Sequence, residues 1–297
     1  MANTFTNLNY TILSTAVFEE FVAQIAPVSS FSVDVSPAPA ERGQTVQALF
    51  MPSQSPAVTF TDGVGYVMQD SQAESVEVVL DNHLYVSTAL TDTQLTNYPQ
   101  VSLEAFGKQK GFQLAKSIFQ TITGGFAAGS GVGQYSEAYS PSGSASSFSI
   151  QDIINIGAEA DDLYWPETGR TIIVNPAQYA SLVSSNELLA AYALGSDVVI
   201  RTGVIPDILG FKIVKSAILP SNISNGIAVM PAALAVAFRP LLVAEGHLYS
   251  VLETLTSPEG YVLTNRRWYS RDLGEQKNVW ESVFGFNQGL PSAAIIF

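Results

Sequence analysis

The chain has 297 residues, of which 47% are hydrophobic and only 13% are charged, and it contains no cysteine. This length and apolar content suffice for one large or two modest domains with a sizeable core, and the absence of cysteine excludes disulfides, thiolate metal sites and cysteine nucleophiles. Acidic residues outnumber basic ones 26 to 13, which argues against a nucleic-acid-binding protein, because phosphate binding depends on clustered Lys and Arg.

The low content of charged residues also indicates that the surface is mostly uncharged. A surface rich in Ser, Thr, Asn, Gln and Ala is typical of one that neighbouring subunits cover, so we expect extensive self-association. No apolar run approaches the roughly 20 residues of a membrane span. The first residues lack a basic segment ahead of an apolar core, so we expect no signal peptide and a chain that is soluble and cytoplasmic when made.

The N-terminal region is predicted to hold one helix and one strand. Residues 13–25 are typical of an amphipathic helix, because a large apolar residue recurs every fourth position from Leu13 to Ile25. Pro27 should end this helix. The alternating segment 31–36 is typical of a half-buried strand.

Between residues 44 and 89 the pattern is β. The strand candidates are 45–50, 57–60, 75–80 and 83–88. The segment has too few large aliphatic residues for a core of its own, so we interpret it as an extended β-hairpin that projects from a body, with its apolar side free for a partner surface. The alternative is an ordinary meander packed on the same chain.

The longest helix is predicted over residues 102–123. Pro99 suits the entry to this helix, apolar residues recur along one stripe of it, and Gly124 and Gly125 end it. At 1.5 Å per residue it is a rod of about 33 Å. A short capped turn of helix, 90–97, precedes it.

The rest of the chain alternates between helix and strand and then returns to β. Residues 126–147 are rich in Gly, Ser and Ala and are predicted to be a mobile loop or linker. A mixed α/β module follows, up to residue 239. Its predicted helices are 149–160, 177–183, 187–193 and 232–238, and its predicted strands are 171–174, 198–201, 210–215 and 227–230. The tail is predicted to contain strands at 247–255, 261–271, 278–286 and 293–297.

No catalytic constellation emerges from the sequence. His83 and His247 are the only histidines, and both lie in strand-like apolar surroundings without a paired acid or serine motif, so we expect them to be structural. The glycine-rich segment 129–133 lacks the lysine and the preceding strand of a phosphate loop. The acidic cluster at 159–162 lacks the spacing of a calcium loop. We therefore predict no enzyme activity, no cofactor and no metal site.

One basic cluster is interleaved with aromatic residues. Alternation along a strand places Arg267 and Tyr269 on one face, and Arg266 and Trp268 on the other, with Arg271 following. This pattern favours ion pairs between subunits over nucleic-acid readout.

The order of these parts, together with four phrases, resembles the major capsid (coat) proteins of tailed bacteriophages, which have the Hong-Kong-97-type fold. The phrases are ALTDTQLTNYP, IIVNPAQYASL, GVIPDILGFKIVKSAILP and VMPAALAVAFRPL. The resemblance in order covers nearly the whole chain. It implies an α+β fold with an N-terminal arm and first strand at 1–36, an extended β-hairpin loop at 37–90, the spine helix of a peripheral domain at 91–125, an axial domain at 126–239 and returning strands of the peripheral sheet at 240–297.

The resemblance further implies a structural protein of the virion. Such a subunit forms pentamers and hexamers of an icosahedral head shell, assembled in the host cytoplasm, that encloses the genome without sequence-specific DNA binding and without a membrane. Scaffolding, portal and cement proteins are the further partners it suggests. Some relatives cross-link through a lysine of the extended loop; here Lys108 is the first lysine, so the hairpin cannot do this. Some carry an N-terminal scaffolding segment; here scaffolding would be a separate protein, already removed, or absent.

The residues that we predict to contact neighbouring subunits are Phe18, Phe21, Arg42, Phe50, Phe60, Tyr66, Glu104, Lys108, Arg266, Arg267, Trp268 and Arg271. Two alternatives to a phage coat remain open from sequence. One is an encapsulin-like nanocompartment shell of the same fold, and the other, from a different class, is a secreted β-rich hydrolase or adhesin.

Overall fold

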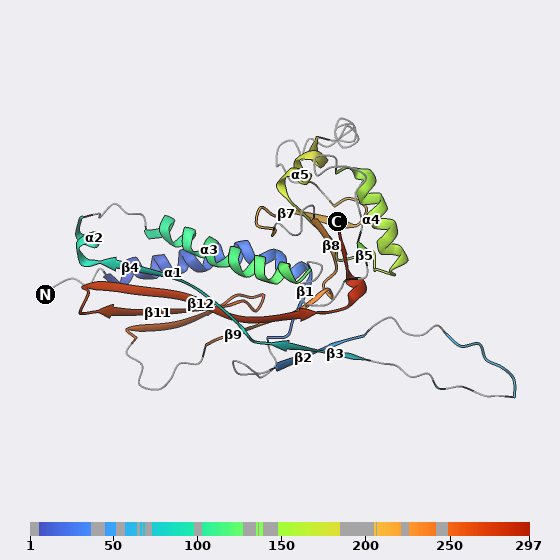
Figure 1. Cartoon of the computed structure of the whole chain (residues 1–297), viewed down its shortest axis with the longest axis horizontal. Helices are drawn as coiled ribbons and strands as arrows, with labels where there is room; N and C mark the ends of the chain where they lie inside the picture. Colours follow the sequence, from blue (N-terminus) through green and yellow to red (C-terminus); the bar gives the residue numbers. More distant parts are fainter. Residues whose placement is uncertain are drawn as a thin grey trace.

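The computed structural model describes residues 6–36, 45–51, 57–63, 66, 68, 73–97, 103–126, 135, 137–138, 148–184, 205, 207–220, 226–241 and 249–297. They form a long body of helices on a sheet, a compact α/β unit at one end of the body, and an arm that extends away from both (Figure 1). The mixed α+β class predicted from the sequence is confirmed.

Two helices run in the same direction along one face of the body. They are α1 (Thr6–Ile25) and α3 (Leu103–Thr123). The predicted four-residue spacing is confirmed, because Leu13, Val17, Phe21 and Ile25 are all buried in one core with the apolar stripe of α3. The first helix begins earlier than predicted and ends just before Pro27, which lies in the 3₁₀ turn η1 (Ala26–Ser30).

By length and composition, the segment Ile12–Ser30 is one that could cross a membrane, with a mean hydropathy of 1.2. Five of its large apolar side chains, Leu13, Val17, Phe21, Ile25 and Val28, are buried in the core with α3 and the sheet. The core helix of a body such as this one meets the same criterion.

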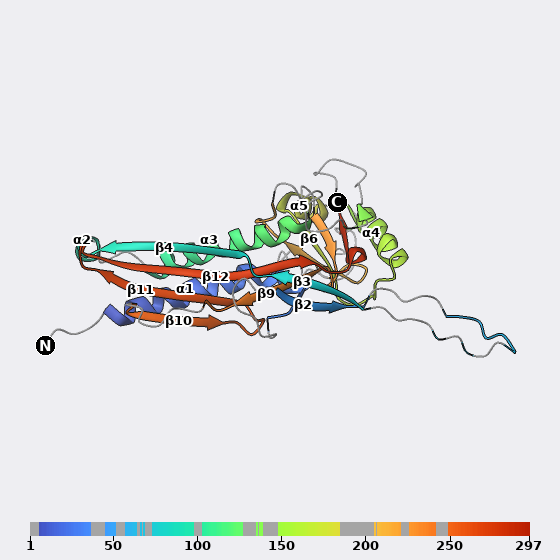
Figure 2. The same cartoon turned by 60° about the horizontal axis from the view of Figure 1, so that its bottom comes forward.

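The six-stranded sheet of the body is built around one long strand. Its members are β1 (Ser32–Asp34), β4 (Asn82–Thr91), β9 (Leu234–Arg239), β10 (Val251–Thr256), β11 (Val262–Ser270) and β12 (Glu275–Gln288). Strand β12 pairs with β4 along one side, and with β11 and then β9 along the other. Outside these lie β10, next to β11 (Figure 2), and β1, next to β9.

The helix predicted at 232–238 is wrong, because this segment is the strand β9. It lies between β1 and β12, and all its residues from Leu234 to Phe238 are buried. A strand covered on both faces is apolar throughout, so its sequence shows no alternation to distinguish it from a short buried helix.

The base of the predicted hairpin is formed by β2 (Thr45–Phe50) and β3 (Glu74–Val79), which pair antiparallel as a two-stranded sheet. Their inner side chains pack on the face of the long sheet that α1 and α3 do not cover. The residues in this contact are Val46, Ala48, Phe50, Val78 and Leu80 from the hairpin, and Ala235, Ala237 and Val283 from the sheet. The expectation that the apolar side of the hairpin waits for a partner is therefore wrong for its base.

Beyond this base, residues 57–60 do not belong to a strand, contrary to the prediction. After β3 the chain turns into β4, which joins the long sheet, and leads through the short helix α2 (Asp92–Asn97) to α3. At the far end of α3, the turn η2 (Gly124–Phe126) leads toward the compact unit.

The compact unit contains a five-stranded sheet in the order β5-β13-β8-β6-β7 and two helices. The bounds are β5 (Glu137–Ala138), β6 (Arg170–Val174), β7 (Phe211–Lys215), β8 (Gly226–Val229), β13 (Ala294–Ile296), α4 (Ile150–Asp162) and α5 (Pro176–Val183). The predicted cap of α4 is present: the backbone N–H and the hydroxyl of Ser149 both donate to Asp152 Oδ2. Asn175 caps α5 by accepting from the N–H of Gln178.

The chain passes between the two units more than once, so the predicted division at residues 126–239 does not match the sheets. Strand β9 belongs to the body, whereas β13, predicted with the returning strands, belongs to the compact unit and reaches it through the turn η3 (Pro291–Ala293). The two connections lie side by side. Gly289 N–H donates to Ala233 O and Leu290 N–H to Ala232 O, both at 2.9 Å.

Some predictions fall outside the described residues. These are the helix at 187–193, the strand at 198–201, most of the loop at 126–147, Arg42 and His247.

Candidate functional site

Three side chains that can ionise meet on the face of the long sheet that the hairpin base also covers. They come from the three adjacent strands β4, β12 and β11. His83 Nε2 lies 2.9 Å from Glu281 Oε2, and the Arg266 guanidinium contacts the other carboxylate oxygen. Glu281 is only 5% exposed. Both oxygens of the carboxylate are therefore engaged within the chain, an arrangement that fixes three strands together rather than one that meets a substrate.

Aromatic rings extend this cluster along the sheet. The Arg266 guanidinium lies over the Tyr249 ring at 5.4 Å, and Tyr249 meets Trp268 edge-on at 5.5 Å. The prediction that Arg266 forms ion pairs between subunits is corrected, because its partners are in its own chain. On the other face Tyr269 donates to Asp92 Oδ2 at 2.5 Å, which raises the pKa of the tyrosine. Half-buried Arg267 and exposed Arg271 complete the predicted basic group.

The candidate contact residues on the helices and on the hairpin base lie in different environments. Lys108 and Glu104 form an exposed pair one turn apart on α3, at 2.7 Å, which lowers the pKa of Glu104 and raises that of Lys108. Phe18 is half-buried against the core. Phe21 and Phe50 are buried inside the subunit, so they are corrected to core residues.

The arm beyond Phe50 presents several strongly exposed large apolar side chains. Tyr66 is 87% and Met68 90% exposed, and the rings of Phe60 and Tyr66 lie 5.1 Å apart. Met51 and Val58 are exposed as well. Figures 1 and 2 both show residues 57–63 at the far end of this arm. Apolar side chains gathered on a projection are typical of a surface that another molecule covers.

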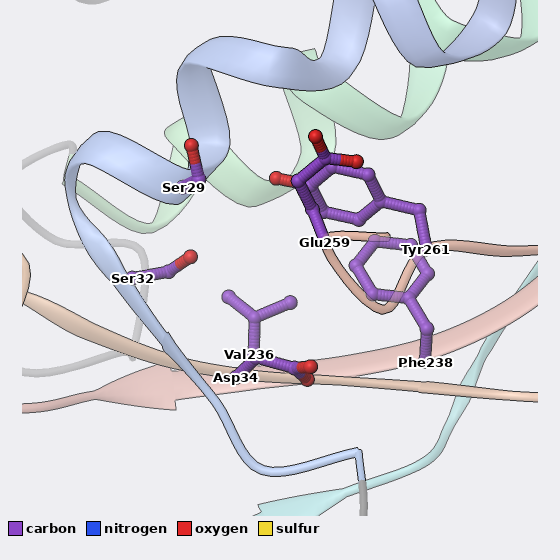
Figure 3. Close-up of a pocket in the computed structure, with 7 residues that line it drawn as sticks. All are labelled: Ser29, Ser32, Asp34, Val236, Phe238, Glu259 and Tyr261. Atoms are coloured by element: carbon purple, nitrogen blue, oxygen red, sulfur yellow. The ribbon is translucent and has the colours of Figure 1, made fainter. Parts of the chain in front are cut away.

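One small cavity lies where η1, β1 and β9 meet the turn between β10 and β11 (Figure 3). It is lined by Ser29, Ser32, Asp34, Val236, Phe238, Glu259 and Tyr261. Its volume of about 50 Å³ holds a few waters but is far below the several hundred Å³ of a small-molecule site. Burial raises the pKa of Tyr261 to about 12, against the opposing effect of its hydrogen bond to Ser29.

In the part of the chain that the structure describes, no three His, Cys, Asp or Glu side chains gather in a way that could hold a metal ion. Within the acidic cluster at 159–162, Asp161 pairs with the buried Arg170 at 2.6 Å. Arg170 also donates to the carbonyls of Trp165 and Pro166 and lies over the Phe211 ring. This group of side chains anchors the end of α4 to β6.

Sequence reasoning missed the glycines that let elements approach closely. A Cβ atom at Gly107 would lie 2.9 Å from the carbonyl oxygen of Leu13, and one at Gly111 would overlap that of Val17. A Cβ at Gly285 would overlap the carbonyl of Val79 in the hairpin base. The spacing Gly-x-x-x-Gly in GKQKG is the signal that could have indicated the helix contact.

Comparison with known proteins shows that this chain is similar to solved structures in its fold. No family model matches the sequence, and no curated protein matches it. A solved structure from Mycobacterium phage Che8 is 19% identical with a TM-score of 0.59, over 86% of this chain and 85% of that one. The capsid structure of cyanophage P-SCSP1u is 15% identical with a TM-score of 0.61, over 89% of this chain and 85% of that one. A virus-like particle from Pyrococcus furiosus is 16% identical with a TM-score of 0.52, over 96% of this chain and 97% of that one. The chain has the fold of phage capsid structures.

Proposed function

We propose that this chain is a structural major capsid protein of a tailed phage, and that many copies form the icosahedral shell enclosing the genome. The observation that carries the proposal is the capsid fold over nearly the whole chain, joined to an arm whose Phe60, Tyr66 and Met68 are exposed in the isolated subunit. Burying such side chains against a neighbour supplies a favourable contact for assembly.

Within the Hong-Kong-97-type fold, the parts of this chain have natural counterparts. Helix α3 is the spine helix, the six-stranded sheet belongs to the peripheral domain, the five-stranded unit is the axial domain, and β2 and β3 form the base of the extended loop. The N-terminal helix α1 packs along α3 in its own subunit, so it contributes to the body rather than reaching a neighbour.

A self-assembling shell subunit needs no catalytic site. The ion pairs of His83, Glu281 and Arg266 are consistent with this, since they are directed at one another. Assembly in the host cytoplasm, with separate scaffolding, portal and cement proteins, belongs to the same proposal.

Negative-stain electron microscopy of the purified full-length chain, with light scattering, tests the proposal. Closed hollow shells, or pentamers and hexamers, are the expected result. A monodisperse monomer that stays monomeric when co-expressed with the proteins encoded beside it would overturn it.

The second candidate is a shell that encloses a protein cargo. It has less support than the phage coat: it rests on the similarity to a virus-like particle from Pyrococcus furiosus over 96% of this chain, whereas the other two solved structures compared above come from phages. Shells purified from the native source distinguish the two, because a genome shell contains nuclease-protected DNA whereas a cargo shell contains a second protein in fixed ratio.

A further inference from the structure

Three buried polar side chains are neighbours on the face of the long sheet that α1 and α3 cover. Asn265 of β11 is directly opposite Trp280 of β12, and Asn278 lies two residues before Trp280, on the same side of β12. Each of the three is at most 2% exposed. Trp280 belongs to the core that the two helices share with the sheet, so this polar group lies within apolar surroundings.

Each of these side chains has one polar atom that finds no hydrogen-bond partner among the described residues. The atoms are Asn265 Oδ1, Asn278 Nδ2 and Trp280 Nε1. The other end of the Asn265 amide is satisfied, because its Nδ2 donates to Ser14 Oγ of α1 at 2.8 Å. A buried donor or acceptor left unpaired is unfavourable, and native structures hold few of them. Three at adjacent positions indicate a shared partner from outside the chain.

The kinds of atom decide what this partner is. The indole N–H of Trp280 and the amide N–H of Asn278 donate, whereas the carbonyl oxygen of Asn265 accepts. Two donors disfavour a metal cation, and the acceptor disfavours an anion. A water molecule matches the set, because it can accept from both donors and donate to the acceptor, and about three hydrogen bonds is usual for a buried water. Water fits either orientation of the two amides, since it both donates and accepts.

The strand geometry suits a bridge of this size. In an antiparallel pair the Cβ atoms of opposed residues lie about 5 Å apart, and those of diagonal neighbours such as Asn265 and Asn278 about 7 Å apart. Two hydrogen bonds through one water join polar atoms that are about 5 Å apart. Side chains at this spacing can therefore surround one water without touching one another.

We propose that one water molecule is bound between α1 and the long sheet, where it accepts from Trp280 Nε1 and Asn278 Nδ2 and donates to Asn265 Oδ1. It joins β11 to β12 in addition to their backbone ladder, and through Asn265 and Ser14 it connects both strands to α1. A shift of α1 along the sheet would break the Ser14 bond, so the polar site fixes the position of this helix. The site belongs to the folded subunit and does not depend on the proposed shell assembly.

A crystal or electron microscopy map of the full-length chain in which ordered waters are resolved tests the proposal directly. The expected result is density for one water within about 3.2 Å of Trp280 Nε1 and of both amides. A direct hydrogen bond between two of the three side chains, with no water beside them, would overturn it. This test uses the native sequence, so it does not rely on any variant that has to fold.

Oxygen-17 magnetic relaxation dispersion, which detects long-lived internal waters, gives a test in solution. Asn278→Leu keeps the branching of the side chain and removes a donor, so this variant should hold one long-lived water fewer per subunit than the native chain. Gln109→Leu makes the same kind of change on the exposed side of α3 and is the matched control, which should lose none. Circular dichroism confirms that both variants are folded. Equal numbers of waters in the native chain and Asn278→Leu would contradict the site.

Urea denaturation tests whether the two amides share the same water. Asn265→Leu and Asn278→Leu should each lower the equilibrium constant for folding about tenfold, because each displaces the water. The double variant should lower it no further than Asn265→Leu alone, since the water is then already lost. Ser14→Ala removes only the bond to α1, so its effect should add to that of Asn278→Leu. Additive effects of the two Asn→Leu changes would overturn the shared site.

Discussion

A Cβ atom placed on Gly111 would overlap the backbone carbonyl oxygen of Val17, so α3 and α1 are in direct backbone contact at this point. One turn earlier, Gly107 faces Leu13 in the same way. Any larger residue at these positions must push the two helices apart and disturb the core that they share with the sheet.

Gly111→Ala should therefore destabilise the subunit by about 2 kcal/mol, although alanine is the better helix former. Urea denaturation followed by circular dichroism measures the free energy of unfolding. Gly124→Ala is the matched control, because no atom lies within 4 Å of its Cβ position. Equal stability of Gly111→Ala and the native chain would show that the helices do not touch there.

Glu281→Gln should destabilise the subunit by about 3 kcal/mol, because Arg266 and His83 lose the carboxylate that both contact in a mostly buried setting. Glu104→Gln removes the exposed pair on α3 and should change little. The comparison uses the same denaturation assay. If both variants lost equal stability, the cluster on the sheet would have no special role.

Stability should fall as the pH rises above 10. The pKa of Tyr261 is raised from 10.0 to about 12 by burial, so the folded state retains a proton that the unfolded state releases. This contribution, about 2–3 kcal/mol, is complete below pH 10 and is lost between pH 10 and 12. Burial raises the pKa of Tyr135 as well, so it adds to the loss in the same range.

Tyr261→Phe should make the free energy of unfolding depend less on pH above 10. The variant should also be somewhat less stable than the native chain at neutral pH. The measurement is the free energy of unfolding at intervals from pH 8 to 12. Exposed Tyr164→Phe is the control and should follow the native curve. A native curve that is flat to pH 12 would contradict the prediction.

Phe60→Ser and Tyr66→Ser should separate folding from assembly. Both side chains are exposed, so each variant should keep its free energy of unfolding within about 0.5 kcal/mol. Shell formation, followed by light scattering, should be slowed or lost. Val46→Ser, in the buried hairpin base, should instead lower the stability of the subunit itself.

The arm can also be removed without deleting any residue of the paired strands at its base. Replacing residues 52–72 by a short turn keeps the paired strands β2 and β3, whereas a deletion from Thr45 to Val86 would also remove half of β4. The shorter deletion should give a folded subunit that fails to assemble. Normal shells from it would show that the arm is dispensable.

Local patterns predicted much of the fold because they have local causes. The prediction of a helix at 102–123 agrees with α3 to within one residue, because a stripe of apolar residues and two terminal glycines determine this helix. The cap at Ser149 was found for the same reason. All four strands predicted for the tail are present, with ends that differ by a few residues.

What the sequence could not provide were contacts between distant segments. Ala235 and Ala237 are small because the hairpin base packs on them, and nothing near them in the sequence indicates that neighbour. The carboxylate that Arg266 contacts, Glu281 of β12, is shared with His83 of β4, and His83 is remote from both in sequence. The sequence does not show this grouping, so it leads to the incorrect prediction that Arg266 pairs with a neighbouring subunit.

The paired connections at residues 232–233 and 289–290 have a mechanical consequence. Two chain segments joined by hydrogen bonds of 2.9 Å behave as a strap between the body and the compact unit. Sliding one segment along the other would break both bonds. A change in the angle between the body and the compact unit would bend both segments together and would also disturb the core that the two units share, to which Ile173, Ile227 and Val229 of the five-stranded sheet belong.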